Sequence, residues 1–195
     1  MTTNNEQKIS IPKSSSATDQ WSFKLQSKTD EFDIPGSFGA TYHSHIKQAS
    51  ELFNILDDLF RNQNLAVLCT QKDGAPYGNL VAFACAENLT KLIFVTPRAT
   101  RKFSNMLSEP RVAMVIDNRS NDRLDFSKAI AVTATGRVTD SSSTQRQRLL
   151  DIYLSKHPHL KEFAQSPSCA VICIDVDTYY CVYRFQNVME LHLRQ

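Results

Sequence analysis

The sequence has little net charge and no long apolar run, and each absence excludes a class of function. Its 195 residues include 22 Lys and Arg against 20 Asp and Glu, and the basic residues are scattered. Nucleic-acid binding needs a basic patch or stripe, so no nucleic-acid partner is expected. No stretch approaches the ~20 apolar residues of a membrane-spanning helix, so no membrane association is expected. The first twenty residues lack an apolar signal-peptide core, which favours a cytoplasmic location.

The sequence also lacks the common motifs of catalytic and metal sites. Its five cysteines include no Cys-x-x-Cys pair, and their odd number and apolar neighbours are typical of buried free thiols in a reducing compartment. There is no phosphate-binding glycine loop and no Ser-His-Asp arrangement. Two His-x-His pairs, at 43 and 45 and at 157 and 159, have no nearby Cys or carboxylate partner. No catalytic residue and no metal ligand is therefore assigned.

Composition divides the chain into an N-terminal region and one larger domain. Residues 1–20 are rich in Ser, Thr, Asn and Gln and are predicted to form a flexible tail. Residues 21–45 contain aromatic side chains without a clear period. They are predicted to form an N-terminal arm, either disordered or lying on the domain or on a partner subunit. Residues 46–195 are predicted to form the folded domain.

The folded domain is expected to be mainly β with helices, an α+β class. Apolar residues at spacings of three and four predict a helix from about Ser44 to Arg61, and shorter helices are predicted near 100–107 and 141–157. Alternating residues and turns such as Lys72-Asp73-Gly74 predict antiparallel strands. The predicted strands are Leu65–Thr70, Tyr77–Ala86, Leu92–Thr96, Val112–Asp117, Ala129–Thr139, Ala170–Val176, Tyr179–Phe185 and Val188–His192. Many short strands with few helices suggest a closed or partly closed barrel.

One segment combines a helix start with positive charge. The run LIFVTPRATRKFSN, from Leu92 to Asn105, contains a strand that ends at Thr96 and a helix that begins near Thr100, a good N-cap. Free N–H groups at a helix start favour an anion, and Arg101 and Lys102 add two positive charges there. These charges oppose the helix dipole at a cost of up to ~1 kcal/mol, which a bound phosphate would remove. A solvated basic turn explains the same residues without a ligand.

The residues around this turn resemble a known family. The run FVTPRATRKFSNMLSEPRVAMVI, from Phe94 to Ile116, is similar without a gap to the flavin-binding stretch of the pyridoxamine 5′-phosphate oxidase-like family, the FMN-binding split barrels. The hairpin LAVLCTQKDGAPYGNLVAFA and the run VTATGRV at 132–138 also resemble that family. The resemblance covers about residues 46–185. It implies a six- to eight-stranded antiparallel split β-barrel with peripheral helices.

The resemblance also implies a set of FMN-binding residues. Those expected to hold the phosphate are Thr96, Thr100, Arg101 and Lys102. Those expected to lie along the isoalloxazine ring, mostly through backbone groups, are Asn79, Leu80, Val81, Ala82, Phe83 and Val95. Asn118 and Arg119 fall where such proteins often reach the flavin. The resemblance further implies a homodimer with FMN at the subunit interface, each site fed by both subunits.

The substrate half of the family pattern is missing. Tyr153 matches a tyrosine that holds pyridoxal phosphate in the oxidase proper, but His157 and Lys161 stand where an Arg and a Ser are expected. Leu80 and Cys85 stand near positions of an Arg and a Lys. A His in place of an Arg removes a permanently charged, bidentate donor. Vitamin B6 is therefore not the expected substrate.

Two kinds of function remain open. The first is an FMN-dependent oxidoreductase that acts on an unknown small substrate, with a donor such as NAD(P)H. The second is a non-catalytic protein that binds flavin or haem for storage or sensing. In that case His43, His45 or His157 are candidate ligands, and on an extended segment His43 and His45 would point the same way.

Overall fold

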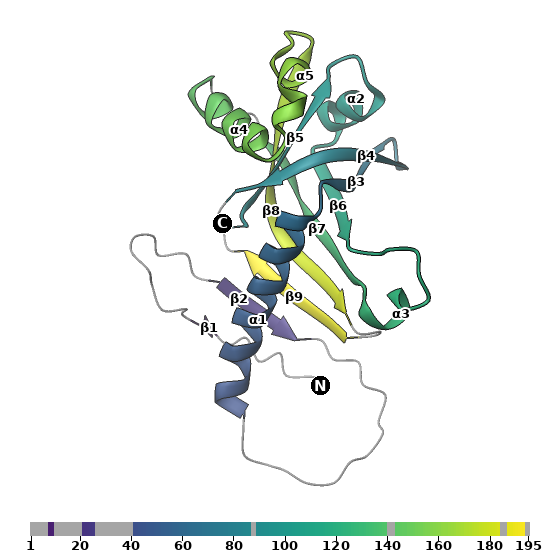
Figure 1. The fold of residues 1–195 in the computed structure, drawn as a ribbon. Coiled ribbons are helices and arrows are strands. Elements are labelled where there is room, and N and C mark those ends of the chain that lie inside the picture. Colours follow the sequence, from purple (N-terminus) through teal and green to yellow (C-terminus); the bar gives the residue numbers. More distant parts are fainter. Residues whose placement is uncertain are drawn as a thin grey trace.

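A computed structural model shows a β-barrel with helices at its periphery (Figure 1). It describes the backbone of residues 8–9, 21–25, 41–86, 89–139, 143–183 and 187–193, and the side chains of 51–86, 89–139, 145–183 and 188–193. The strands are β1 (Lys8–Ile9), β2 (Trp21–Leu25), β3 (Leu65–Lys72), β4 (Ala75–Cys85), β5 (Lys91–Pro97), β6 (Arg111–Asp117), β7 (Ile130–Thr139), β8 (Cys169–Tyr183) and β9 (Asn187–Leu193). The helices are α1 (Thr41–Asn62), α2 (Arg101–Ser108), α3 (Asp125–Lys128), α4 (Ser143–Lys156) and α5 (Lys161–Gln165), with a 3₁₀ turn at Pro158–Leu160.

Six of the described strands close into an antiparallel barrel. They follow the order β8-β5-β4-β3-β6-β7, and β7 completes the ring by pairing with β8. The first half of β8 pairs with β5, and its second half pairs with β9 on the same edge. From β9 the sheet continues through β2 and β1. The predicted α+β barrel is confirmed.

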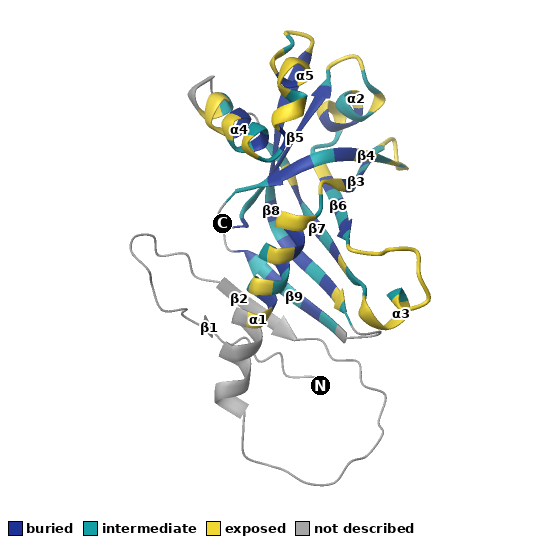
Figure 2. Cartoon of the chain, in the orientation of Figure 1, coloured by how far each residue is buried: buried dark blue, intermediate teal, exposed yellow. Residues whose placement is uncertain are grey.

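The interior of the barrel is filled by alternate residues of its strands and by one face of α1. On β3 the residues Ala66, Leu68 and Thr70 are buried, while their neighbours are half-buried or exposed, as the two-residue period of a strand requires (Figure 2). Helix α1 adds Leu52 and Leu56, both fully buried. This packing removes the apolar stripe of α1 from water against the residues that fill the barrel.

A second apolar cluster lies on the outer side of β4, β5 and β8. Its strand residues include Ile93 and Val95 of β5, and helix α4 covers them with Leu149, Leu150 and Tyr153. Helix α5 contributes the buried Ala164 to the same cluster. The helices therefore cover one side of the barrel wall, whereas the outward residues of β3 and β6 stay half-exposed.

Gly136 allows the barrel to close. A β-bulge between Thr135 and Gly136 shifts the register of β7 against β8. A Cβ atom at position 136 would lie 2.1 Å from the carbonyl oxygen of Asp175, a distance that no side chain tolerates. Glycine is therefore required here by the close approach of two backbones.

Several local predictions differ from the observed elements. Helix α1 begins at Thr41, three residues before the predicted start, so His43 and His45 both lie in a helix and not on an extended segment. The predicted break between 176 and 179 is also wrong, because β8 continues through both residues, with Asp177 at the bulge and Thr178 paired with Thr135. Helices α3 and α5 were not expected. No helix in the described ranges is long and apolar enough to cross a membrane.

The N-terminal predictions fall largely outside the described residues. Within the predicted tail, Lys8–Ile9 forms β1, and within the predicted arm, Trp21–Leu25 forms β2, which pairs with β9 of the same chain. Residues 41–45 of that arm belong to α1. The proposed division into a tail, an arm and a domain at 46–195 stays a prediction.

The barrel wall splits where β4 separates from β5. The two strands pair only from Phe83↔Phe94 to Cys85↔Leu92, and the earlier part of β4 pairs with β3. At the split the Phe83 carbonyl accepts a hydrogen bond of 2.8 Å from His157 Nε2. Because a carbonyl only accepts, Nε2 carries the proton. His157 is 1% exposed, and at the position where the oxidase has an arginine it joins the end of α4 to β4.

Lys156, the residue before His157, joins the end of α1 to the end of α4. Lys156 Nζ donates to the carbonyls of Phe60 and Gln63, both at 2.6 Å, at the end of α1. It also lies 4.0 Å from the centroid of the Phe83 ring. Burial lowers the pKa of Lys156 to about 8. The end of α4 is therefore joined to the end of α1 through Lys156 and to β4 through His157.

The substitution His157→Leu tests the hydrogen bond from His157 to the Phe83 carbonyl. We expect the free energy of unfolding to fall by about 1–3 kcal/mol, because the Phe83 carbonyl loses its donor. Chemical denaturation measures the change. His159→Leu is the matched control, since His159 is exposed two residues away and a change below about 0.5 kcal/mol is expected there. Equal losses in both variants would contradict the assignment.

The same variant should change the response to acid. Burial lowers the pKa of His157, so the folded chain holds the ring neutral while the unfolded chain binds a proton below about pH 6.5. Stability is therefore lost as the pH falls through this value. Denaturation curves recorded at about pH 7 and about pH 5 should show a smaller loss for His157→Leu than for the wild type. Parallel losses would show that another group titrates.

Candidate functional site

The turn between β5 and α2 brings the two predicted phosphate-binding threonines together. Thr96 lies at the end of β5 and is fully buried, and its Oγ1 lies 3.2 Å from Thr100 Oγ1. The Thr100 hydroxyl donates to the Pro97 carbonyl at 2.8 Å, so Thr96 is the donor within the threonine pair. Thr96 therefore positions Thr100, and Thr100 is the member of the pair on the outer side of the turn.

Thr100 occupies the N-cap of α2, as predicted, but its side chain does not cap the helix. Its backbone is extended, with φ −100° and ψ 151°, and its hydroxyl points back to Pro97. The first N–H groups of α2 are consequently left without a side-chain acceptor. An uncapped helix start with positive residues beside it suits an anion.

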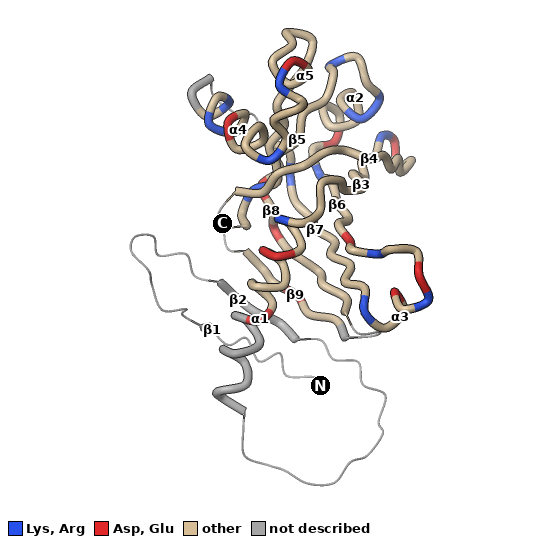
Figure 3. Tube along the Cα trace, in the orientation of Figure 1, with Lys and Arg blue, Asp and Glu red and all other residues tan. Residues whose placement is uncertain are grey.

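Arg101 and Lys102 begin the helix at this point. The Arg101 guanidinium lies over the ring of Tyr77 on β4, with its Cζ 5.4 Å from the ring centroid. The ion pairs found in the described ranges involve neither cation. Figure 3 shows this basic stretch at the turn into α2, at the end of the barrel away from α3. The turn thus carries positive charge without a counterion among the described side chains.

A buried hydrogen bond that sequence reasoning missed docks α2 on the barrel. Asn105 Nδ2 donates to Thr70 Oγ1 at 3.0 Å, and Thr70 in turn lies 3.4 Å from the Tyr77 carbonyl. Both Asn105 and Thr70 are buried. The link joins the helix to the β3–β4 hairpin and so sets Arg101 beside Tyr77. The sequence signal that could have revealed this hydrogen bond is an Asn on the apolar face of a short amphipathic helix.

The β4 residues predicted to lie along the flavin ring divide between the two faces of the strand. Val81 and Phe83 point into the barrel core. Ala82 packs in the outer cluster, which also contains Val95 of β5, and Leu80 continues that outer face with 64% of its surface exposed. The structure therefore brings Leu80, Ala82 and Val95 to one outer face of the barrel wall, where α4 buries Val95, and it withdraws Val81 and Phe83 from that face.

Asn79 contains a buried acceptor that no described protein group satisfies. Its Oδ1 is enclosed without a hydrogen-bond partner, and its Nδ2 makes only a 3.5 Å contact with the Leu80 carbonyl. Leaving a buried acceptor unpaired costs about 1–3 kcal/mol, so such groups are rare and call for an explanation. An N–H or O–H of a ligand beside β4 supplies one.

Asn118 and Arg119 lie apart from these residues. They follow β6 at its far end, near α3, whereas α2 precedes β6 (Figure 1). Asn118 Oδ1 accepts from the Ile130 N–H at 2.7 Å, and Arg119 Nε lies 3.2 Å from Asp117 Oδ1. Within one chain, the structure does not bring these two residues to the β5–α2 turn.

The positions that match the oxidase's substrate contacts form no open phosphate site. Tyr153 and His157 are each 1% exposed, and burial raises the pKa of Tyr153 to about 12. Burial likewise raises the pKa of the Cys85 thiol to about 12. Lys161 is exposed at the start of α5. These environments agree with the absence of the vitamin B6 contacts from the sequence.

Comparison with known proteins gives a family and a shared fold. The family model of pyridoxamine 5′-phosphate oxidase matches residues 55–183. No curated protein matches the chain. Among solved structures, a heme binding protein from Mycobacterium smegmatis is similar over 69% of this chain, with 15% identity and a TM-score of 0.62. This match spans about half, 55%, of that protein.

Two further structures are similar along most of their own length. A FAD-binding protein from Mesorhizobium loti shares 14% identity over 73% of this chain and 94% of its own, with a TM-score of 0.51. A putative pyridoxamine 5′-phosphate oxidase from Listeria innocua shares 15% identity over 67% and 98%, with a TM-score of 0.52. At these identities the solved structures establish the fold alone. The family match, in contrast, covers all six barrel strands and the β5–α2 turn, and the chain belongs to the pyridoxamine 5′-phosphate oxidase family.

Proposed function

We propose that this chain binds FMN and acts as a flavin-dependent oxidoreductase on a small substrate. The observation that carries the proposal is the β5–α2 turn, where Arg101 and Lys102 stand beside uncapped N–H groups without a described counterion. A terminal phosphate carries close to two negative charges at neutral pH and three acceptor oxygens. Its charge and its acceptors match the two cations and the free donors of this turn.

The remaining site residues fit the rest of a flavin mononucleotide. Leu80 and Ala82 offer an apolar outer surface for the ring, at the edge of the cluster that α4 covers. When bound, FMN supplies the redox chemistry. The chain's own residues bind the phosphate, orient the ring against β4 and β5, and exclude water from one of its faces.

The environments of the buried His157 and the partly exposed His192 favour flavin over haem. His157 Nε2 is used by the Phe83 carbonyl. His192 lies 3.1 Å from Thr178 Oγ1 through Nδ1 and 3.0 Å from Glu190 through Nε2. Each ring therefore has a structural role. The side chains of His43 and His45 lie outside the described residues.

The functional unit in this proposal is a homodimer. The outward residues of β3 and β6 form half-exposed apolar pairs, such as Val67↔Val115 and Cys69↔Ala113. The exposed Leu80 pairs with Val67, so this surface is continuous with the proposed ring site. A second copy on this face would cover the apolar surface and close the flavin site from the other side. It would also be the route by which Asn118 and Arg119 reach a flavin.

NADH or NADPH is the proposed electron donor. Anaerobic mixing of the flavin-loaded protein with each nucleotide separates the two kinds of function. Bleaching of the flavin absorbance supports an oxidoreductase, whereas a bound flavin that neither nucleotide reduces assigns the chain to storage or sensing.

The double variant Arg101→Ala with Lys102→Ala tests the phosphate site. Loss of a charged hydrogen bond costs ~1.5–3 kcal/mol, so the two losses together should weaken FMN binding by about 100-fold or more. Quenching of flavin fluorescence during titration measures the affinity. The matched control is Arg123→Ala with Lys128→Ala, which removes two exposed charges near α3 and should leave the affinity unchanged. Equal FMN affinities in the two double variants would refute the site.

The substitution Val67→Arg tests the dimer. A charge at the centre of the apolar face should convert a dimeric wild type into a monomer, because an unpaired buried charge is costly at an interface. Light scattering after size-exclusion chromatography gives the mass. Leu124→Arg is the control, because Leu124 is 53% exposed in the loop before α3. The Leu124→Arg variant should remain a dimer. A monomeric wild type would exclude the homodimer.

A further inference from the structure

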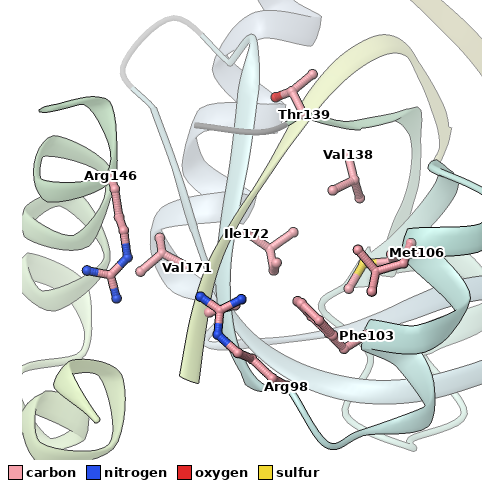
Figure 4. A pocket seen from close by; sticks show the side chains of 10 residues that line it. Arg98, Phe103, Met106, Val138, Thr139, Arg146, Val171 and Ile172 are labelled. Atoms are coloured by element: carbon pink, nitrogen blue, oxygen red, sulfur yellow. The ribbon is translucent and has the colours of Figure 1, made fainter. Parts of the chain in front are cut away.

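A cavity lies between α2, α4 and the start of β8. Its volume is about 470 Å³. Its lining includes Arg98, Phe103, Val138, Arg146, Val171 and Ile172 (Figure 4). None of the four residues predicted to hold the FMN phosphate lines it. It is therefore distinct from the proposed flavin site.

The cavity forms where two barrel strands part. The described ladder between β7 and β8 ends at Thr139↔Cys173, whereas β8 continues to Cys169 in its pairing with β5. Helix α2 stands on one side of this stretch of β8 and α4 on the other (Figure 4). Residues Ala170, Val171 and Ile172 of β8 are thereby shared between the barrel wall and the cavity.

The β5–α2 turn directs its basic residues to two different places. The Arg98 N–H donates to the Ser168 carbonyl at 2.9 Å, just before β8. Its guanidinium lies over the Phe103 ring, with Cζ 5.6 Å from the centroid. Arg101, three residues later, stacks instead on Tyr77 of β4. One arginine of the turn therefore belongs to the cavity and the other to the flavin site.

Two arginines face this cavity without a described counterion. The guanidinium groups of Arg98, from the turn, and Arg146, from α4, both point toward Val171 (Figure 4). The ion pairs in the part of the chain that the structure describes include neither residue. Two cations that line one cavity repel each other, and an anion between them would remove that cost. Guanidinium groups match carboxylate and phosphate oxygens in geometry as well as in charge.

The rest of the cavity is suited to an apolar group. Phe103, Met106 and Leu107 of α2 face Val138, Val171 and Ile172 of the strands. The volume falls within the roughly 300–1,000 Å³ of small-molecule sites, which are mostly apolar with a few placed polar groups. Inorganic phosphate alone would leave these walls uncovered.

We infer that this cavity is a binding site for a small organic anion, in which a carboxylate or phosphate is attached to an apolar or aromatic body. The anionic group lies between Arg98 and Arg146, and the apolar body lies against Phe103 and the end of β8. The inference does not depend on FMN binding, because the two sites share no lining residue.

Calorimetric titration of the full chain with 1-naphthyl phosphate tests the inference. Arg98→Gln and Arg146→Gln should each weaken binding by at least about tenfold, the minimum expected for loss of a charged hydrogen bond. Arg148→Gln is the matched control: Arg148 is exposed on the same helix, does not line the cavity, and should bind as the wild type does. Inorganic phosphate and uncharged 1-naphthol should each bind the wild type at least about tenfold more weakly than 1-naphthyl phosphate.

The double variant Arg101→Ala with Lys102→Ala separates this site from the flavin site. It should retain 1-naphthyl phosphate binding whether or not it still binds FMN. Thermal unfolding of each variant checks that it is folded. If one of the two cavity variants does not fold, the other still tests the inference. The inference is overturned if the wild type does not bind the probe, if the three single variants bind it equally, or if only the Arg101/Lys102 variant loses it.

Discussion

The pairing of β8 on both of its edges is the constraint on which the rest of the structure depends. Over its fifteen residues this strand pairs with β5 and then β9 on one edge, and with β7 on the other. Closure of the barrel requires the bulge at Gly136, where only a glycine fits against the Asp175 carbonyl. The same pairing sets Thr96 opposite Ala170, which fixes the end of β5 and hence the turn that carries the basic residues. The cavity lined by Arg98 and Arg146 opens where the described pairing of β7 with β8 ends.

The β5–α2 turn concentrates positive charge at one end of this barrel. Thr100 turns away from the helix it precedes, α2 starts without a side-chain cap, and Arg101 and Lys102 stand at that start. Each feature is locally unfavourable in the absence of an anion. These features support the proposed flavin phosphate at the start of α2. Arg98 and Arg146 support the separate anion site proposed beside them.

Local patterns in the sequence predicted the elements, and distant contacts explain what they missed. The periods of two and of three to four residues located β3 to β7, α1, α2 and α4, because each pattern reflects one buried face. Asp177 and Thr178 lie between two predicted strands, but β8 is continuous there because its pairing with β7 resumes at Thr178 after the bulge. His157 was matched to a phosphate contact by position, whereas its partner is Phe83, 74 residues away. The cavity joins Arg98 to Arg146, and no local pattern brings residues so far apart together.

The central claim is that this member of the family holds a flavin at the β5–α2 turn. The most direct test is the absorption spectrum of the purified protein, recorded before and after dialysis against FMN. A flavin bound at the turn should give the two absorption bands of an oxidised flavin, and these bands should remain with the protein after gel filtration. Reduction with dithionite should make them disappear. A protein that stays colourless after exposure to FMN, or that shows the Soret band of haem in place of the flavin bands, would contradict it.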